Sequence, residues 1–226
     1  AGLPKGVLNM VTGPGDAVGM TVVKHDRVRA VSFTGHRDTG TAILRAAGLK
    51  RVGLEMGGKN GIIVLDDADL DLALGGVIWG GYGTTGQRCT AASRVIVHEK
   101  IKDEFQSKLV GRIRKLRLGD GLKADTDVGP LVNKAAQEKS RRYVEIGKRE
   151  GAKLVIGGKV PDMDGFFFEP TLFTDCSVDM RVCQEEIFGP VVCLISVGDF
   201  DEAIDVMNSI EYGLSSAIYT HDVNKA

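Results

Sequence analysis

The segment GYGTTGQRCTAASRVIV, residues 81–97, places a single cysteine, Cys89, after a run of small and polar residues and before a run that predicts a strand. A thiol in such a loop can be held as a thiolate by oriented backbone N–H groups and act as a nucleophile, and the small residues would leave room for a substrate. A buried, inert thiol is the common alternative. The other cysteines have apolar or acidic neighbours, which indicates core or surface thiols: Cys176, Cys183 and Cys193.

Glu55 is a second group that could do chemistry, because it ends an apolar strand pattern in VGLEMGGKN, just before two glycines. Open α/β folds bind ligands at the carboxyl ends of their strands. With partial burial, a carboxylate at this position would accept a proton near neutral pH and serve as a general base. An exposed strand-end acid in a salt bridge is the alternative.

Two further segments could contact a ligand. In SFTGHRDTG, residues 32–40, a strand runs into Gly35 and a helix opens near Gly40. The free N–H groups of a helix start suit a pyrophosphate, although Thr-Gly pairs also occur for helix capping alone. In QEEIFGPVV, residues 184–192, one carboxylate and the ring could contact the hydroxyls and the flat face of a ligand, and a solvated charge pair is the alternative.

Short β-branched runs alternate with helical patterns along the chain, which predicts an α/β fold with largely parallel strands. In the charged helix expected at residues 100–119, Phe105, Leu109 and Ile113 should face the core. A domain boundary is expected near residues 57–61. The expected strands are residues 6–13, 28–35, 50–57, 60–67, 93–99, 152–158 and 190–199, and the other expected helices are residues 16–25, 36–49, 68–82, 133–151 and 200–216.

Composition and charge argue against several classes of protein. The 226 residues include 29 Lys and Arg against 30 Asp and Glu, so neither nucleic acid nor an anionic membrane is an expected partner. No apolar run approaches the ~20 residues that span a bilayer, and the first residues lack the pattern of a signal peptide, so a cytoplasmic protein is expected. The cysteines and histidines show no spacing typical of metal ligands, so no metal site is expected.

Together and in this order, FTGHRDTG, LEMGGKN, GQRCTAASR and EEIFGPVV resemble successive signature segments of the NAD(P)-dependent, non-acylating aldehyde dehydrogenase superfamily. The resemblance runs through essentially the whole chain. It implies an aldehyde dehydrogenase-like fold, in which residues 1–57 end a Rossmann-type NAD(P)-binding domain and residues 58–226 belong to an α/β catalytic domain that carries the thiol. It also implies a small aldehyde as substrate, NAD or NADP as cofactor, and a homodimer or homotetramer.

The resemblance implies a role for each matched position. Cys89 would attack the aldehyde carbon to give a thiohemiacetal, hydride would pass to NAD(P), and Glu55 would activate the water that hydrolyses the resulting thioester. Relatives that acylate coenzyme A generally lack this acid. The residues implied to contact the cofactor are Thr34, Gly35, His36, Gly40, Met56, Gly57, Glu186 and Phe188. Of these, Gly35 to Gly40 would face the pyrophosphate and Met56 would lie near the nicotinamide, while Glu186 would hold its ribose and Phe188 would pack beside the ring.

The sequence also departs from the family pattern. His36 stands where many members have Ser, and Gly61 where Pro is common. Members of the family are longer, and they carry an oxyanion-hole Asn, a Lys-containing strand end for the adenosine ribose, and a terminal strand that joins subunits, none of which is matched here. We therefore expect a partial chain, lacking N-terminal and C-terminal segments and weakly active or inactive alone.

The sequence is also compatible with a function of a different class, in which the chain is a truncated, catalytically inactive piece with a binding or structural role. Saturable cofactor binding measured by calorimetry would count against it. Arg88 carries two alternatives of its own, since it could pair with the acidic group of a semialdehyde substrate or make a purely structural contact.

Overall fold

The structure, a computed structural model, describes residues 2–226. The chain forms two compact units, Ala1–Gly57 and Gly58–Ala226, and each has its own sheet. Both units are of the α/β type with parallel strands, as the alternation of strand and helix patterns predicted. Within the described part of the chain, no helix combines the length and the apolar character needed to cross a membrane.

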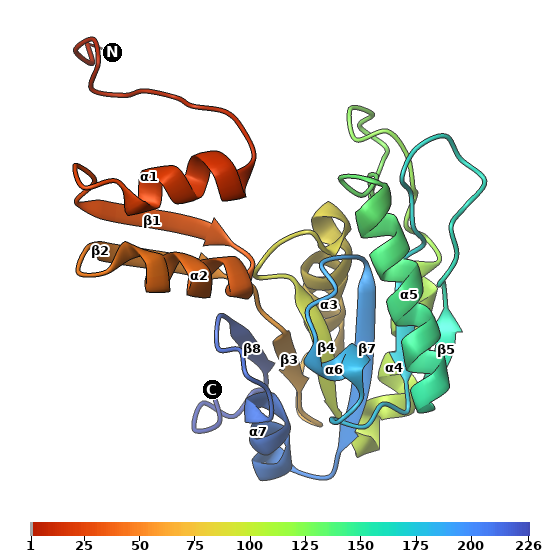
Figure 1. The fold of residues 1–226 in the computed structure, drawn as a ribbon. Helices are drawn as coiled ribbons and strands as arrows, with labels where there is room; N and C mark the ends of the chain where they lie inside the picture. The colour runs from red at the N-terminus through yellow and green to blue at the C-terminus, as the bar shows by residue number, and fades with distance from the viewer. Residues whose placement is uncertain (1) are drawn as a thin grey trace. The chain divides into compact units, whose positions relative to one another are not determined.

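The first unit is a strand–helix–strand arrangement preceded by a short helical segment (Figure 1, red and orange). Its two strands, β1 and β2, are parallel, and a small buried core is formed by Val23, Ile43 and Ala47. The elements are η1 (Gly15–Gly19), α1 (Met20–Lys24), β1 (Ala30–Gly35), α2 (Arg37–Ala47) and β2 (Arg51–Met56).

The strand expected at residues 6–13 is wrong. These residues form no strand, and all of them are exposed. A segment becomes a strand only when a neighbour pairs with its backbone N–H and C=O groups. In this two-stranded sheet, β1 and β2 pair only with each other.

The second unit is built on a six-stranded sheet in the order β5-β6-β7-β4-β3-β8. All neighbours are parallel except β5 and β6. The strands are β3 (Asn60–Val64), β4 (Ala92–His98), β5 (Lys153–Ile156), β6 (Thr171–Thr174), β7 (Val191–Val197) and β8 (Ser216–Tyr219). The helices are α3 (Leu70–Tyr82), η2 (Gly83–Gly86), η3 (Glu99–Ile101), α4 (Lys102–Ile113), α5 (Lys134–Glu150), α6 (Arg181–Gln184) and α7 (Phe200–Asn208).

Alternate residues of the central strands serve two separate hydrophobic cores. On β4, Val95 and Val97 belong to the core that includes residues of α3 and α4, whereas Ile96 belongs to the core that includes residues of α5, α6 and α7. Successive side chains of a strand point to opposite faces of its sheet. The sheet is therefore covered on both faces, which explains why its central strands are almost continuously apolar (Figure 1).

The sequence pattern predicted the buried face of one helix of this unit correctly and the end of another helix wrongly. In α4, Phe105, Leu109 and Ile113 are buried, as their spacing predicted. The helix expected at residues 200–216 instead ends at Asn208, and Ser216, the last residue of that range, begins β8, which lies beside β3.

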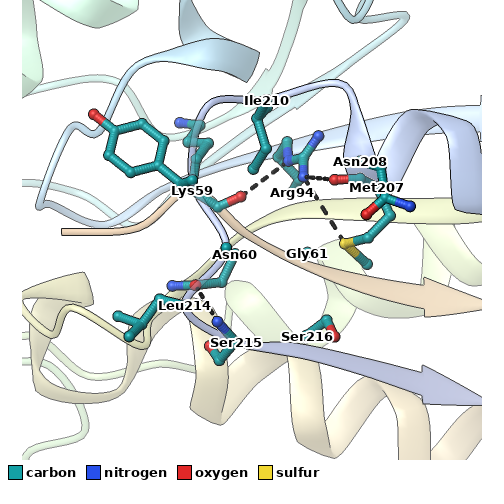
Figure 2. A pocket seen from close by; sticks show the side chains of 12 residues that line it. Lys59, Asn60, Gly61, Arg94, Met207, Asn208, Ile210, Leu214, Ser215 and Ser216 are labelled. Atoms are coloured by element: carbon teal, nitrogen blue, oxygen red, sulfur yellow. Dashed lines mark hydrogen bonds between the residues drawn. The ribbon is translucent and has the colours of Figure 1, made fainter. Parts of the chain in front are cut away.

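Arg94 explains where α7 ends, because this fully buried cation reaches from β4 to the helix end (Figure 2). Its Nε donates to the carbonyl oxygen of Lys59 at 3.0 Å, Nη1 to that of Val206 at 2.9 Å, and Nη2 to that of Met207 at 2.9 Å. The last carbonyls of a helix lack full intrahelical partners and carry its negative dipole end. The guanidinium therefore satisfies these carbonyls and fixes α7 against the sheet.

We expect Arg94→Met to lower the free energy of unfolding by about 3–5 kcal/mol, because it leaves two buried carbonyls and one partly buried carbonyl without their donor. Arg94→Lys keeps the charge but not the planar set of donors, so its free energy of unfolding should lie between those of Arg94→Met and the wild type. Guanidinium chloride unfolding measures both, with the exposed Arg114→Met as the matched control. Equal unfolding midpoints for Arg94→Met and Arg114→Met would contradict this account.

Candidate active site

Cys89 lies in the turn between η2 and β4, and its side chain is half-buried. The backbone before it is left-handed, with φ of 51° at Thr84 and 59° at Thr85, which is strained for β-branched residues. At Gly86, where φ is 65°, an added Cβ would strike the carbonyl oxygen of Gly189. The glycine before the thiol is therefore required by a close approach of two backbone segments, in addition to any space it leaves for a substrate.

Asn60 holds the backbone of the cysteine turn. Its Nδ2 donates to the carbonyl oxygens of Cys89 at 2.7 Å and Ala91 at 3.0 Å, and its Oδ1 accepts from the N–H of Ser215 at 3.1 Å. The side chain is only 4% exposed, so bulk water does not replace these bonds. One buried amide thus ties the turn of Cys89 to the start of β3 and to the segment that leads into β8.

Glu186 contacts the turn that precedes β3, where its Oε1 accepts from the N–H of Gly58 at 3.1 Å. A Cβ at Gly58 would lie 2.9 Å from the carbonyl oxygen of Cys89 and 2.7 Å from Oδ1 of Asn60, so no larger residue fits there without a shift. Glu186, the turn at residues 58–60 and Cys89 are therefore joined by one set of contacts, although Glu186 and Gly58 lie 128 residues apart in sequence.

Phe188 has a left-handed backbone, with φ of 59°, and a side chain that leaves the residue 41% exposed. A bulky residue in this conformation is uncommon and strained, and such residues cluster at functional sites. A shallow cleft next to it is lined in part by Gly58, Arg88, Ser93 and Glu186. Phe188 and Glu186 therefore line the same depression in the surface.

The candidate groups of the second unit gather at the amino ends of its strands. Gly58 precedes β3, Cys89 precedes β4, and Glu186 precedes β7, and these three strands are consecutive in the sheet. Ligands of open parallel sheets usually bind at the carboxyl ends. The usual rule therefore fits Glu55 in the first unit but not this cluster.

Arg88 makes a structural contact. Its Nη2 donates to the carbonyl oxygen of Trp79 at 2.8 Å, and its guanidinium carbon lies 4.9 Å from the centre of the Trp79 ring. Donation to a backbone carbonyl and stacking on an indole fix the orientation of the guanidinium against α3. These contacts favour the structural alternative for Arg88 over pairing with a substrate carboxylate.

In the first unit, Thr34 and Glu55 lie directly opposite each other on the parallel strands β1 and β2, close to the carboxyl end of each strand. Both side chains are exposed, so the partial burial expected of Glu55 is not found. Gly57, the last residue of this unit, is half-buried. Glu55 and Cys89 belong to different units.

His36 is the N-cap of α2, where its Nδ1 accepts from the N–H of Asp38 at 3.3 Å. The two glycines nearby have packing reasons of their own. A Cβ at Gly35 would lie 2.5 Å from the ring of Phe33, and one at Gly40 would lie 2.7 Å from the sulfur of Met56. The structure thus brings Gly35, His36, Gly40 and Met56 together around the start of α2.

The pocket drawn in Figure 2 lies elsewhere in the second unit. It is lined by Lys59, Asn60, Arg94 and residues between Met207 and Ser216, and none of the predicted site residues lines it. Asn60, which lines this pocket, also bonds to the turn of Cys89.

Asn60 is the residue of this site that the sequence did not indicate. Its three partners are backbone groups at residues 89, 91 and 215, and a side chain bonded to distant backbone produces no spacing pattern. The available signal was chemical, since an amide in the otherwise apolar run NGIIV must find partners when buried.

Comparisons with known proteins show which family the chain resembles. The model of the aldehyde dehydrogenase family matches residues 1–226. The betaine aldehyde dehydrogenase of Brucella anthropi is 47% identical over 229 residues, which cover 99% of this chain and 47% of that protein. The alpha-ketoglutaric semialdehyde dehydrogenase of Bacillus subtilis is 44% identical over 231 residues, which cover 100% of this chain and 47% of that protein.

A solved structure of betaine aldehyde dehydrogenase from Staphylococcus aureus in complex with NAD+ is 43% identical and superposes with a TM-score of 0.97. The match covers 100% of this chain and 46% of that one. The chain therefore spans about half the length of the relatives it matches.

Proposed function

The chain belongs to the aldehyde dehydrogenase family, and on this premise we propose that the protein oxidises an aldehyde to a carboxylic acid with NAD or NADP. Residues 1–57 form the end of the NAD(P)-binding domain, and residues 58–226 belong to the catalytic domain that supplies the thiol. The names of the two relatives above specify a semialdehyde and betaine aldehyde as substrates, and the proposed substrate class of this protein is accordingly a small aldehyde.

In the first step of the proposed reaction, the thiolate of Cys89 attacks the aldehyde carbon. A C–S bond forms, and the carbonyl electron pair moves to the oxygen, which becomes the oxyanion of a thiohemiacetal. The backbone N–H of Cys89 donates to this oxyanion. Asn60 holds the neighbouring carbonyl oxygen of Cys89, and so keeps the backbone of the nucleophile in one orientation.

Each unit contains described residues that fit a different part of a dinucleotide. The 11-residue helix α2 begins at exposed residues, so its N-terminal N–H groups, beside Thr34, Gly35 and His36, can hold the pyrophosphate. In the second unit, the Glu186 carboxylate and the exposed ring of Phe188 offer an acceptor for ribose hydroxyls and a flat face for the nicotinamide. When bound, the cofactor accepts the hydride that leaves the former aldehyde carbon.

Glu55 completes the reaction by removing a proton from water. The water oxygen attacks the thioester carbon on Cys89, the C–S bond breaks with its electron pair returning to sulfur, and the carboxylic acid leaves. The exposed position of Glu55 at the end of β2 leaves its carboxylate accessible to solvent within its own unit.

One observation supports the proposal more than any other: contacts of Asn60 and Gly58 join the Cys89 turn to Glu186 at neighbouring strand ends. The test is to incubate the full-length protein with betaine aldehyde, a dicarboxylate semialdehyde and simple aliphatic and aromatic aldehydes, each with NAD and with NADP. Reduced cofactor should form with at least one pair, and iodoacetamide should label Cys89 by peptide mass spectrometry. Absence of both would overturn the proposal.

Asn60→Ala should lower kcat by about 10- to 100-fold, because the carbonyl of Cys89 loses its donor and the nucleophile is less well oriented. Asn60→Asp keeps the shape but replaces both donated bonds with carboxylate–carbonyl repulsion, so it should be at least as impaired. KM should change less than kcat, and alkylation of Cys89 by iodoacetamide should slow in parallel. If Asn60→Ala changed only the melting temperature and left kcat intact, the amide would be purely structural.

A further inference from the structure

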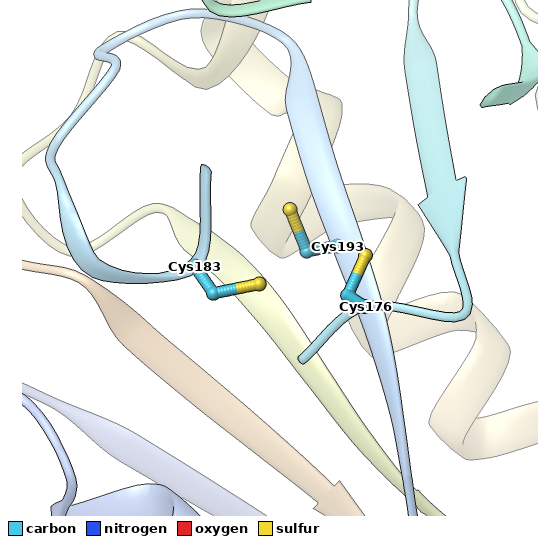
Figure 3. Close-up of side chains that lie close together, drawn as sticks. All are labelled: Cys176, Cys183 and Cys193. Atoms are coloured by element: carbon cyan, nitrogen blue, oxygen red, sulfur yellow. The ribbon is translucent and has the colours of Figure 1, made fainter. Parts of the chain in front are cut away.

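Three cysteines that are far apart in the sequence meet inside the second unit. Cys176 follows β6, Cys183 lies in α6 and Cys193 lies in β7, and their sulfur atoms all lie within 4.8 Å of one another (Figure 3). Cys183 and Cys193 are fully buried, and Cys176 is 8% exposed. The proposed chemistry of the family uses none of these thiols.

The cluster is packed beside a buried cation that has no hydrogen-bond partner. Lys59 is fully buried, and its Nζ bonds to no group in residues 2–226. Burial lowers the pKa of Lys59, the charge of Arg94 adds to that shift, and electrostatic interaction with Cys193, Cys183 and Cys176 acts against it. Uncompensated positive charge in a protein interior is costly, so this lysine favours negative charge on the sulfurs.

We propose that Cys176, Cys183 and Cys193 form a binding site for one thiophilic divalent cation, Zn²⁺ or its congener Cd²⁺. The site offers three sulfur donors, and no carboxylate or imidazole of the described residues joins the cluster, which favours soft metals over Mg²⁺ or Ca²⁺. Three sulfurs bound to one zinc at about 2.3 Å lie roughly 3.8–4.0 Å apart, so the observed spacing needs only a small contraction.

The charge balance also favours the loaded site. One M²⁺ ion and three thiols give a trithiolate complex and three protons, so the cluster changes from neutral to a net charge of −1. The unpartnered ammonium of Lys59 then becomes its counter-ion.

Metal binding would break two weak contacts of the thiols, and the ion needs a route into the cluster. The thiol of Cys193 contacts the carbonyl oxygen of Val182 at 3.3 Å and that of Cys176 contacts Thr174 at 3.6 Å, and both carbonyls would lose these weak donors. Cys176, at 8% exposed, is the least buried residue of the three, so we expect the ion to enter from the loop between β6 and α6.

The test uses the full-length protein with Cys89→Ser, so that the candidate nucleophile cannot bind metal. Cd²⁺ is titrated into the metal-free, reduced protein, and sulfur-to-cadmium charge-transfer absorption and bound cadmium are measured. We expect one Cd²⁺ per chain. Adding Cys176→Ser should weaken binding at least roughly 10-fold, and Lys59→Met should weaken it about 10- to 100-fold through loss of the counter-ion.

Zn²⁺ should displace the cadmium with loss of the absorption band. The ¹¹³Cd chemical shift of the Cys89→Ser protein reports the number of sulfur ligands without any change in the cluster, so the test stands even if the cluster variants do not fold. A shift outside the range of three-sulfur coordination, an absent charge-transfer band, or equal binding after Cys176→Ser would overturn the proposal.

Discussion

Cys89→Ser is expected to lower the rate of aldehyde oxidation by about 10⁴-fold or more, with the melting temperature unchanged within a few degrees. A serine hydroxyl at this half-buried turn cannot ionise near neutral pH, so the covalent intermediate does not form. The measurement is the reduction of NAD or NADP by the full-length protein, with cofactor binding measured by calorimetry on the same sample.

Cofactor affinity serves as the control for Cys89→Ser, because the thiol is not among the groups proposed to hold the dinucleotide. A variant that binds cofactor normally and no longer turns over separates loss of the nucleophile from loss of the fold. Residual activity within 10-fold of the wild type would show that another group forms the bond to the substrate.

Glu55→Gln is expected to divide the reaction into a fast and a slow phase. Attack by Cys89 and hydride transfer do not need the carboxylate, so one equivalent of reduced cofactor should appear in a burst. Hydrolysis of the thioester should then be about 10²–10⁴-fold slower, since the glutamine amide cannot take the proton from water. Stopped-flow absorbance measures the burst, and mass spectrometry of the quenched protein detects the acyl group on Cys89.

The exposed acid Glu99, which lies in η3, provides a matched control for this prediction. Glu99→Gln should show wild-type turnover and no accumulation of the acyl-protein. Combining Glu55→Gln with Cys89→Ser should abolish the burst as well as turnover. A Glu55→Gln protein with unchanged steady-state turnover would remove Glu55 from the proposed mechanism.

The fold was largely predictable where one strand or helix carries its own pattern. The apolar periodicity of α4 and the apolar runs of β3, β4 and β7 mark elements that the structure contains. The pattern failed where an element depends on its neighbours. Residues 6–13 have strand-like composition but no partner, and the four residues of β8 acquire their structure from β3.

Some residues of the candidate site could likewise be predicted from the sequence, and others could not. Cys89, Glu186 and Phe188 lie in segments with recognisable composition, and the structure gathers these three residues' segments at one edge of the sheet. Asn60 and the three-cysteine cluster did not stand out, because their partners are brought together only by the tertiary fold. Spacing rules detect ligands within one helix or loop, and they miss those supplied by separate elements.

The bond between Asn60 and Ser215 also has a consequence for the order of events during protein synthesis. The ribosome makes the turn of Cys89 long before it makes Ser215 and β8. Domains fold while synthesis continues, but a contact forms only after both partners have left the exit tunnel. A nascent chain that stops short of Ser215 therefore carries its nucleophile without the full set of bonds that orient it, and the thiol becomes fully positioned only after Ser215 has left the exit tunnel.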